Sequence, residues 1–332
     1  MRLTLTASLL ALCAWSASIG NVADLVAAVR AGLKASQADA EIARTVRDAR
    51  LADRVDFAAI EELQSEGAGP ETVEALDRQR WLTESLPPAA LHLFDAPATP
   101  SPEQQAAAIE KARTIAIAYS ASLPNFLCTE MVHRYHAGTG SQNWKEDDLL
   151  KVALAYSDKG ERYRLLEING KPTSKSLNST GDMWSSGEFG SILGLIFANE
   201  SAAQFQWERW SILRGRAALV FSFRVDQAHS GYHVAWKSKG AIVGLAGKVY
   251  LDRETHQVMR LGYEAEGIPA TSPILRTFCL VDYEYAEVGG QSFLLPKRAD
   301  SRVVLKGGQD RNVLSFGAYR KFSGEATVTF DK

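Results

Sequence analysis

Residues 243–264 read VGLAGKVYLDRETHQVMRLGYE, and this stretch decides the fold. It predicts two strands, Val243–Leu251 and Gln257–Glu264, which are rich in aliphatic and aromatic residues. The polar turn Asp252–Thr255 separates them. Because a link this short makes the strands antiparallel neighbours, the stretch predicts a hairpin of an antiparallel sheet.

The same pattern repeats on both sides of this hairpin. The other expected strands are residues 125–135, 148–156, 162–168, 204–213, 217–225, 232–238, 276–286, 292–304 and 312–322. Short turn signals such as Asn169-Gly170 and Gly289-Gly290 separate several of them. About eleven strands exceed what a flat sheet holds comfortably, so we expect the sheet to curl. The predicted fold class is α+β, with a curved antiparallel sheet that forms a half β-barrel.

One dense apolar segment, residues 183–197, interrupts the series of strands. It is too apolar for an exposed loop, yet Gly187, Gly190 and Gly194 weaken any helix that contains them. We expect a short apolar helix or plug against the concave face of the sheet. The candidate ligand-binding residues are the apolar side chains of this segment and two tryptophans of the next strand: Trp184, Phe189, Ile192, Leu193, Ile196, Phe197, Trp207 and Trp210.

These aromatic residues also fit a second interpretation, an ordinary packed core. Trp207 and Trp210 are three residues apart, which on a regular strand directs them to opposite faces. A ligand-binding role requires that the curved sheet leave a cavity that its own side chains do not fill.

The chain ahead of the sheet predicts a separate helical domain, residues 21–85. Leu25, Val29 and Leu33 recur at helical spacing, and Asp56 is suited to cap a later helix. Residues 21–100 carry 14 Asp and Glu against 8 Lys and Arg, whereas residues 101–332 carry 25 against 28. This asymmetry suggests two units, joined by a proline-rich linker at residues 86–101. Residues 102–332 then form the half-barrel domain.

Residues 1–20 predict a signal peptide. Met1-Arg2 is followed by the apolar run Leu3–Trp15 and by small residues up to Gly20. The run is shorter than the roughly 20 residues that span a bilayer, and no later stretch is suited to a stable span. We therefore expect cleavage and a periplasmic or secreted protein. A lipid anchor on Cys13 is the less favoured alternative, because Leu12 is not the small residue that such a site requires.

The two cysteines of the mature chain are Cys128 and Cys279. In an oxidising compartment they are candidates for one disulfide, and two buried free thiols are the alternative. Neither belongs to a CxxC motif, which argues against redox catalysis.

The sequence offers no constellation that would support catalysis or metal binding. His133 and His136 are separated by an odd number of residues on an expected strand, so they point to opposite faces. His229 and His233 lack a neighbouring carboxylate or thiolate. Nucleophile, phosphate-loop and dinucleotide motifs are missing, as is a basic stripe for nucleic acid. We expect a protein that is not an enzyme and that uses neither metal nor cofactor.

Several short motifs carry a family resemblance. They are LLEINGKP (165–172), GKVYLD (247–252), VMR (258–260), VDY (281–283) and FLLP (293–296). In order and spacing they resemble an exported, uncharacterised family of acidobacteria-type bacteria. Through it they resemble the periplasmic lipoprotein carriers of the LolA/LolB type and a related sensor domain that binds an anti-sigma factor. The resemblance covers about residues 101–330, and the helical domain lies outside it. It implies a half-barrel that holds acyl chains under a helical lid, and no ligand-contacting residue is carried over.

Taken together, these features predict a periplasmic, non-catalytic carrier or binding protein for a lipid, an acyl chain or a lipidated protein. The alternative is a protein-interaction or envelope-sensing module with a fully packed sheet, whose acidic helical domain or sheet edge meets a protein partner. A hydrolase with a dispersed site is a third hypothesis. A hollow sheet interior favours the carrier, and a filled one favours the interaction module.

Overall fold

The computed structural model describes residues 19–89, 96–157, 160–180, 189–236 and 239–322. The chain divides into two units, residues 1–95 and 96–332. Nearly all of the expected signal peptide lies outside the described residues. No helix of the described ranges is long and apolar enough to cross a membrane.

The N-terminal unit consists of four helices around an apolar core. They are α1 (Val22–Lys34), α2 (Asp39–Asp48), α3 (Phe57–Ser65) and α4 (Pro70–Leu82). The side chains of Asn21 and Asp56 accept hydrogen bonds from backbone amides at the starts of α1 and α3, as helix caps do. Leu25, Leu63 and Leu76 are fully buried. The spacing of apolar residues therefore predicts the helical faces correctly.

Side chains join α2 and α4 at both ends. Asp39 accepts hydrogen bonds from the Glu71 amide (2.7 Å) and the Thr72 amide (3.2 Å), so it caps α4 from the first residue of α2. The Nε2 of Gln79 donates to the carbonyl of Val46 (2.8 Å), near the end of α2. Backbone groups at helix ends lack intrahelical partners, so these bonds fix the pairing of the two helices.

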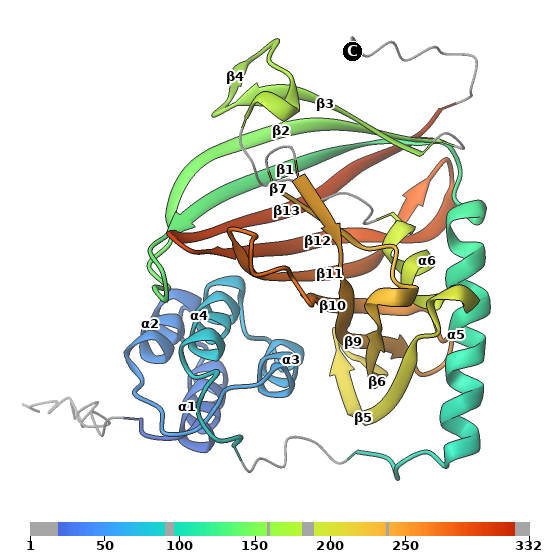
Figure 1. Ribbon diagram of the computed structural model, residues 1–332. Coiled ribbons are helices and arrows are strands. Elements are labelled where there is room, and N and C mark those ends of the chain that lie inside the picture. The colour runs from blue at the N-terminus through green and yellow to red at the C-terminus, as the bar shows by residue number, and fades with distance from the viewer. Residues whose placement is uncertain (1–18, 90–95, 158–159, 181–188, 237–238, 323–332) are drawn as a thin grey trace, which may run out of the picture. The chain divides into compact units, whose positions relative to one another are not determined.

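The C-terminal unit begins with α5 (Pro102–Ser122), whose start is closed by a reciprocal capping box between Ser101 and Gln104. An antiparallel sheet of eleven strands follows, in the order β4-β3-β2-β1-β13-β12-β11-β10-β9-β6-β5. Its strands are β1 (Phe126–Ala137), β2 (Lys145–Ser157), β3 (Gly160–Ile168), β4 (Lys171–Pro172), β5 (Gln204–Leu213), β6 (Arg216–Val225), β9 (Gly244–Asp252), β10 (Val258–Glu266), β11 (Ile274–Val288), β12 (Gln291–Leu305) and β13 (Gly308–Lys321). The sheet curves strongly without closing (Figure 1), which confirms the predicted α+β half-barrel.

Two strand predictions need correction. The segment expected as a strand at 232–238 does not join the main sheet, because β7 (His233–Trp236) pairs with β8 (Lys239–Ile242) in a separate two-stranded sheet. The edge strand β4 was missed because it contains two residues. It follows Asn169 and Gly170, whose positive φ values of 50° and 73° make the tight hairpin turn.

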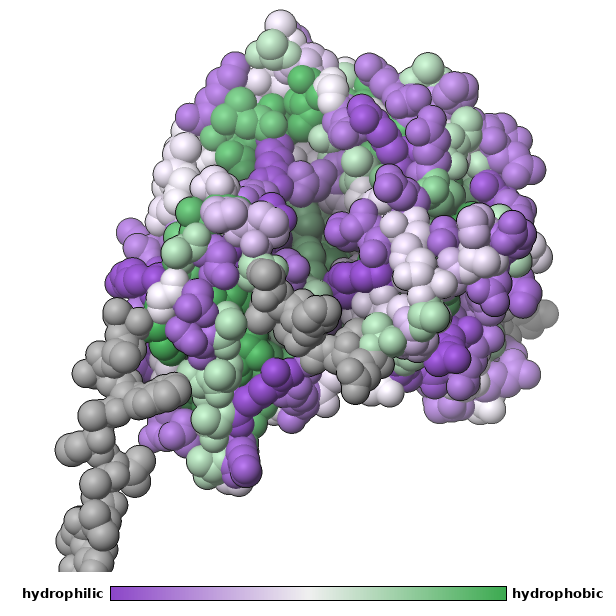
Figure 2. All heavy atoms as spheres, turned by 90° about the horizontal axis from the view of Figure 1, so that it is seen from below, coloured by the Kyte–Doolittle hydropathy of each residue, from purple (hydrophilic) through white to green (hydrophobic). Residues whose placement is uncertain are grey.

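The concave face of the sheet is covered by helices. The apolar face of α5, which includes Ile109 and Ala112, belongs to the same buried core as side chains of most strands. A second helix, α6 (Ser191–Phe197), lies between α5 and the sheet (Figure 1). On the face shown in Figure 2, hydrophilic residues cover much of the surface and hydrophobic residues form smaller patches.

The expected disulfide is not formed, because Cys128 and Cys279 are buried free thiols. Cys128 lies on β1 and Cys279 on β11, and two strands, β13 and β12, lie between them. Neighbouring strands are about 4.8 Å apart, so the two residues are separated by about 14 Å along the sheet. A disulfide requires Cα atoms within about 7 Å. The alternative of two free thiols is the one that the structure supports.

Candidate ligand-binding site

The described part of the segment expected as a plug, residues 189–197, contains α6, and its apolar side chains gather in the core of the half-barrel. Trp184 lies outside the described residues. Five candidates are at most 4% exposed: Phe189, Ile192, Leu193, Ile196 and Phe197. They share one buried cluster with α5 and the concave face of the sheet.

The two ends of this segment contact opposite parts of the curved sheet. The ring of Phe189 lies 5.4 Å from Phe126 on β1 and 5.4 Å from Phe316 on β13. The ring of Phe197 stacks on Phe205 of β5 at 5.3 Å. The segment therefore spans the trough from its central strands to an edge strand.

Trp207 and Trp210 lie on the same side of β5, which corrects the prediction that they point apart. Trp207 pairs with Phe221 and Arg209 with Val220, so Glu208 is an extra residue that makes a β-bulge. The bulge shifts the alternation by one residue, and the two indole rings meet edge to face at 5.4 Å.

Few hydrogen bonds hold α6 in place. The helix has seven residues, includes Gly194, and follows Gly190 at a φ of +128° with no side-chain cap. At its other end, Nη1 of Arg113 on α5 donates to the carbonyl of Phe197 (2.7 Å), and the Ser201 hydroxyl donates to that of Ile196 (2.8 Å). A helix of this length is unstable on its own, so side-chain packing keeps it folded.

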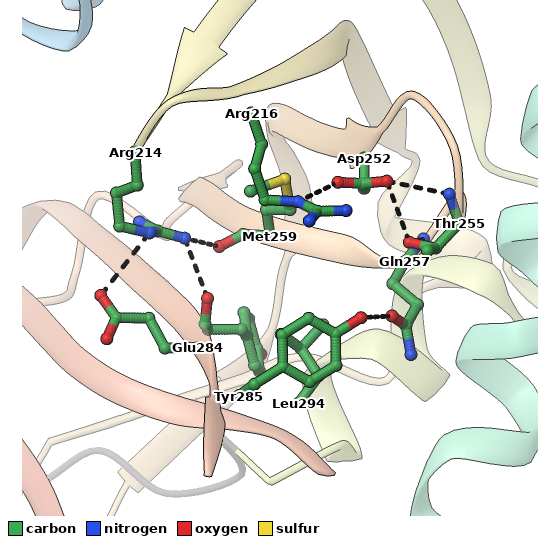
Figure 3. A pocket seen from close by; sticks show the side chains of 10 residues that line it. Arg214, Arg216, Asp252, Thr255, Gln257, Met259, Glu284, Tyr285 and Leu294 are labelled. Carbon is green, nitrogen blue, oxygen red and sulfur yellow. Dashed lines mark hydrogen bonds and ion pairs between the residues drawn. The ribbon is translucent and has the colours of Figure 1, made fainter. Parts of the chain in front are cut away.

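In the described part of the chain, α6 and α5 pack against the concave face of the sheet and share one buried apolar cluster with it. The expectation that the curved sheet leaves part of its apolar lining open to a ligand stays a prediction. The described residues also form a cavity of about 350 Å³ at one end of the strands. Its lining residues are Arg214, Arg216, Asp252, Thr255, Gln257, Met259, Tyr283, Glu284, Tyr285 and Leu294 (Figure 3).

The pocket lies where β10 and β11 stop pairing. Their register runs from Glu264 opposite Phe278 to Arg260 opposite Asp282. Beyond this point the guanidinium of Arg214 donates to the carbonyls of Met259 (3.1 Å) and Tyr283 (2.9 Å). One side chain therefore bridges the two strands in place of backbone hydrogen bonds.

Arg214 is directed into this gap by a tight turn and by charge. Arg214 and Gly215 have positive φ values of 51° and 75° and link β5 to β6. The Asp282 carboxylate accepts hydrogen bonds from Arg214 (2.7 Å) and from Arg260 (2.7 Å and 3.0 Å). Burial opposes ionisation of Asp282, but the two guanidinium groups hold its pKa below the usual value. The gap is thus fixed by a satisfied ionic network.

Asp252 organises the opposite wall of the pocket. It is 3% exposed and accepts hydrogen bonds from Nε of Arg216 (2.6 Å) and from the amides of Glu254 (2.9 Å) and Thr255 (2.8 Å). Burial raises the pKa of the Asp252 carboxyl, but these hydrogen bonds lower it by more. The pKa of Asp252 therefore lies below its usual value. The hydroxyl of Tyr285 donates to Gln257 across the pocket (Figure 3).

This lining is suited to binding a polar group beside an apolar surface. It contains guanidinium, carboxylate, amide and hydroxyl groups together with Met259 and Leu294, and no histidine, serine or cysteine is among the residues that line it. Elsewhere, His133 and His136 pair with Glu146 (2.7 Å) and Asp147 (2.5 Å). The described residues hold no group of three side chains that would bind a metal ion.

The sequence did not single out any pocket residue. The polar lining comes from two hairpin turns and from strand ends that lie up to 80 residues apart, between Arg214 and Leu294. Two features of the sequence could have pointed to the pocket: the glycine turn at Arg214-Gly215 and the turn that begins at Asp252 between β9 and β10. Neither feature indicates that the two turns lie close together.

No protein-family model and no curated protein matches the chain. Among solved structures, the chain is similar to a LolA superfamily protein from Nitrosomonas europaea, with 12% identity, a TM-score of 0.32, and 66% of this chain and 93% of that chain covered. It is also similar to a putative outer membrane lipoprotein-sorting protein domain from Vibrio parahaemolyticus. Here the identity is 10% and the TM-score is 0.35, and the match covers 65% of this chain and 94% of that chain. A further match is the MucA/MucB complex structure of Pseudomonas aeruginosa. Here the identity is 12% and the TM-score is 0.22, and the match covers 64% of this chain and 94% of that chain. The LolA-type resemblance expected from the sequence motifs is thus also found among solved structures.

Proposed function

We propose that the chain is an exported, periplasmic carrier or binding protein that takes up a lipid, an acyl chain or a lipidated protein in place of α6. The observation that supports this proposal is the character of α6, an uncapped seven-residue apolar helix that fills the concave face of an open half-barrel. In this view α6 is an internal substitute for the ligand. The candidate residues of α6 then line or gate the site, as expected from the sequence.

The magnitudes of burial favour an exchange of α6 for a ligand. Fully burying one large aliphatic or aromatic side chain contributes about 1.5–3 kcal/mol, and one methylene of a bound chain contributes about 0.8 kcal/mol. The buried side chains of Ile192, Leu193, Ile196 and Phe197 are therefore comparable with an acyl chain of roughly a dozen carbons. A nearly balanced exchange allows both uptake and release, which a carrier needs.

Two features give α6 a defined way to leave. Gly190 permits a backbone conformation at the start of the helix that other residues rarely adopt. Arg113 provides a single charged hydrogen-bond donor at the end of the helix. Breaking the hydrogen bonds from Arg113 and Ser201 and rotating about one glycine is a smaller change than separating strands.

The experiment combines native mass spectrometry with hydrogen exchange. Protein purified from its own cell envelope is expected to carry co-purified lipid. Addition of a long-chain fatty acid to lipid-free protein is expected to speed exchange of the amides in residues 191–197, while exchange in β9 and β10 stays unchanged. Protein that is always empty, with α6 equally protected at every fatty acid concentration, would contradict the proposal.

An interaction or envelope-sensing module is the second candidate, and the close packing of α6 on the concave face favours it. In that case α6 is permanent core, and a protein partner binds at the acidic N-terminal unit or at an edge of the sheet such as β5. Fixed protection of α6 together with a stoichiometric protein complex isolated from the envelope would support this function.

A further inference from the structure

We propose that the pocket at the β10–β11 gap binds the anionic end of an acyl-chain amphiphile through the two Nη atoms of Arg216. The ligand class is a carboxylate or phosphate that carries at least one long acyl chain. This inference rests on the proposed function, because it places the polar end of the same ligand whose apolar part replaces α6.

The guanidinium of Arg216 is bound to protein through its Nε and presents its two Nη atoms to the pocket. Its Nε donates to Asp252 (2.6 Å), and its two Nη atoms make no hydrogen bond within the described part of the chain. The guanidinium lies across the pocket, with Tyr285 on the opposite side (Figure 3). Two parallel N–H groups of an arginine match two oxygens of a carboxylate or phosphate. Because Asp252 is itself fixed by two backbone amides, Arg216 presents these donors in one orientation.

In the same pocket, the guanidinium donors of the neighbouring Arg214 already have acceptors. Its nitrogens contact two carbonyls and the carboxylate of Asp282, and its Nε is 3.5 Å from Glu284. Each carboxylate of the pocket therefore already faces an arginine. The open donors belong to Arg216, whose side chain is 44% exposed, so an added anion binds there with the least rearrangement.

The floor of the pocket continues into the core that α6 occupies. Tyr285 is paired across the strands with Leu294, and both Leu294 and Tyr283 belong to the main buried cluster. Tyr119 of α5 packs edge to face on Tyr283 at 6.4 Å and donates its hydroxyl to the carbonyl of Leu294 (2.7 Å). A ligand with its head at Arg216 thus has an apolar path along the junction of α5 and the sheet.

The test compares two probes of equal chain length, oleate and oleyl alcohol, on the full mature chain by isothermal titration calorimetry. Arg216→Gln is expected to weaken oleate binding by about tenfold or more and to leave oleyl alcohol within twofold. Arg216→Lys keeps the charge but loses the paired donors, so we expect partial recovery of oleate binding. The matched control is Arg224→Gln on the same strand, whose side chain is 61% exposed and lies outside the pocket lining.

The outcomes separate this inference from the proposed function. If both probes bind and Arg216→Gln affects neither, the pocket assignment is wrong and the carrier function stands. If neither probe binds to the unaltered protein, the proposed function fails first. Inorganic phosphate serves as the third probe: binding that depends on Arg216 and matches the affinity of oleate would show a site for free anions and overturn the amphiphile assignment. Unchanged far-UV circular dichroism and a single cooperative unfolding transition in Arg216→Gln, Arg216→Lys and Arg224→Gln serve as the check on folding.

Discussion

The helix α6 and the pocket at the β10–β11 gap lie in one half-barrel but are held by opposite kinds of interaction. Apolar packing keeps α6 in place, with few hydrogen bonds to its backbone from outside the helix. Around the gap, Arg214, Arg260 and Asp282 form a partly buried network with short, directed contacts. Packing is non-directional and exchangeable for another apolar surface, whereas an ionic network tolerates little displacement. The difference indicates which part moves and which part stays fixed during binding.

The largest effect is expected from Asp282→Ala, which removes the centre of the fixed network. Two guanidinium groups would lose their shared carboxylate, and breaking a buried pair costs about 3–5 kcal/mol. Urea unfolding should show this loss in the free energy of unfolding. Asp226→Ala is the control, because the Asp226 side chain is 61% exposed and its ion pair is long (3.7 Å). An equal, small loss in both variants would mean that the gap is not a rigid element.

The next test compares one buried aliphatic residue from each region. Leu261 on β10 and Ile196 in α6 are both fully buried. Leu261→Ala should cost about 2–5 kcal/mol of unfolding free energy, as large core deletions do. Ile196→Ala should cost about 1 kcal/mol, because α6 can undock instead of keeping a cavity. It should also tighten fatty acid binding, since less packing must be displaced. Equal destabilisation without tighter binding would count against an exchangeable helix.

A smaller effect is expected from Arg113→Ala, which removes the donor at the end of α6. The loss of one hydrogen bond from a charged group, about 1.5 kcal/mol, should raise exchange of the α6 amides roughly tenfold. Exchange of β10 and β11 amides should not change. Glu110→Ala is the matched control, because it removes the ion pair with Arg113 (3.3 Å) and keeps the bond to Phe197. Unaltered exchange of α6 in the Arg113 variant would show that packing alone determines its opening.

The smallest expected effect is on the pH dependence of the melting temperature, which should involve Asp252 in the pocket but not α6. Because the pKa of Asp252 is lowered in the folded protein, its carboxylate contributes stability above the pKa of the unfolded chain. That contribution is lost as the pH falls through the folded pKa. The melting temperature should therefore fall between pH 7 and pH 3 by more in the unaltered protein than in Asp252→Asn. Ile196→Ala should follow the unaltered protein, since α6 carries no titrating group. An identical pH profile for Asp252→Asn would exclude this contribution.

The sequence predicted the apolar part of this molecule well. Alternating residues and short turns located the strands of the main sheet except β4 to within a few residues, as at Gln204–Leu213, and apolar density located α6. Both signals are local, because the hydrophobic pattern of a strand or a short helix depends only on the residues of that segment. The helical faces of the N-terminal unit follow from the same kind of pattern.

What the sequence did not reveal depends on register and on contacts between distant turns. The bulge at Glu208 reverses the facing of Trp210, and a strand order that separates Cys128 from Cys279 excludes the disulfide. The pocket needs the Arg214 turn and the Asp252 turn to meet, which pairing of β6 with β9 determines. No local pattern encodes these distances.

The interrupted pairing between β10 and β11 has a mechanical consequence. A continuous ladder resists splaying because many backbone contacts must stretch together, but past Met259 and Tyr283 a single guanidinium carries that load. The stiffness of the half-barrel at this crease therefore depends on the side chains of Arg214, Asp282 and Arg260 and not on backbone pairing. Because the charged network tolerates little displacement, it braces the strand ends where the ladder is interrupted.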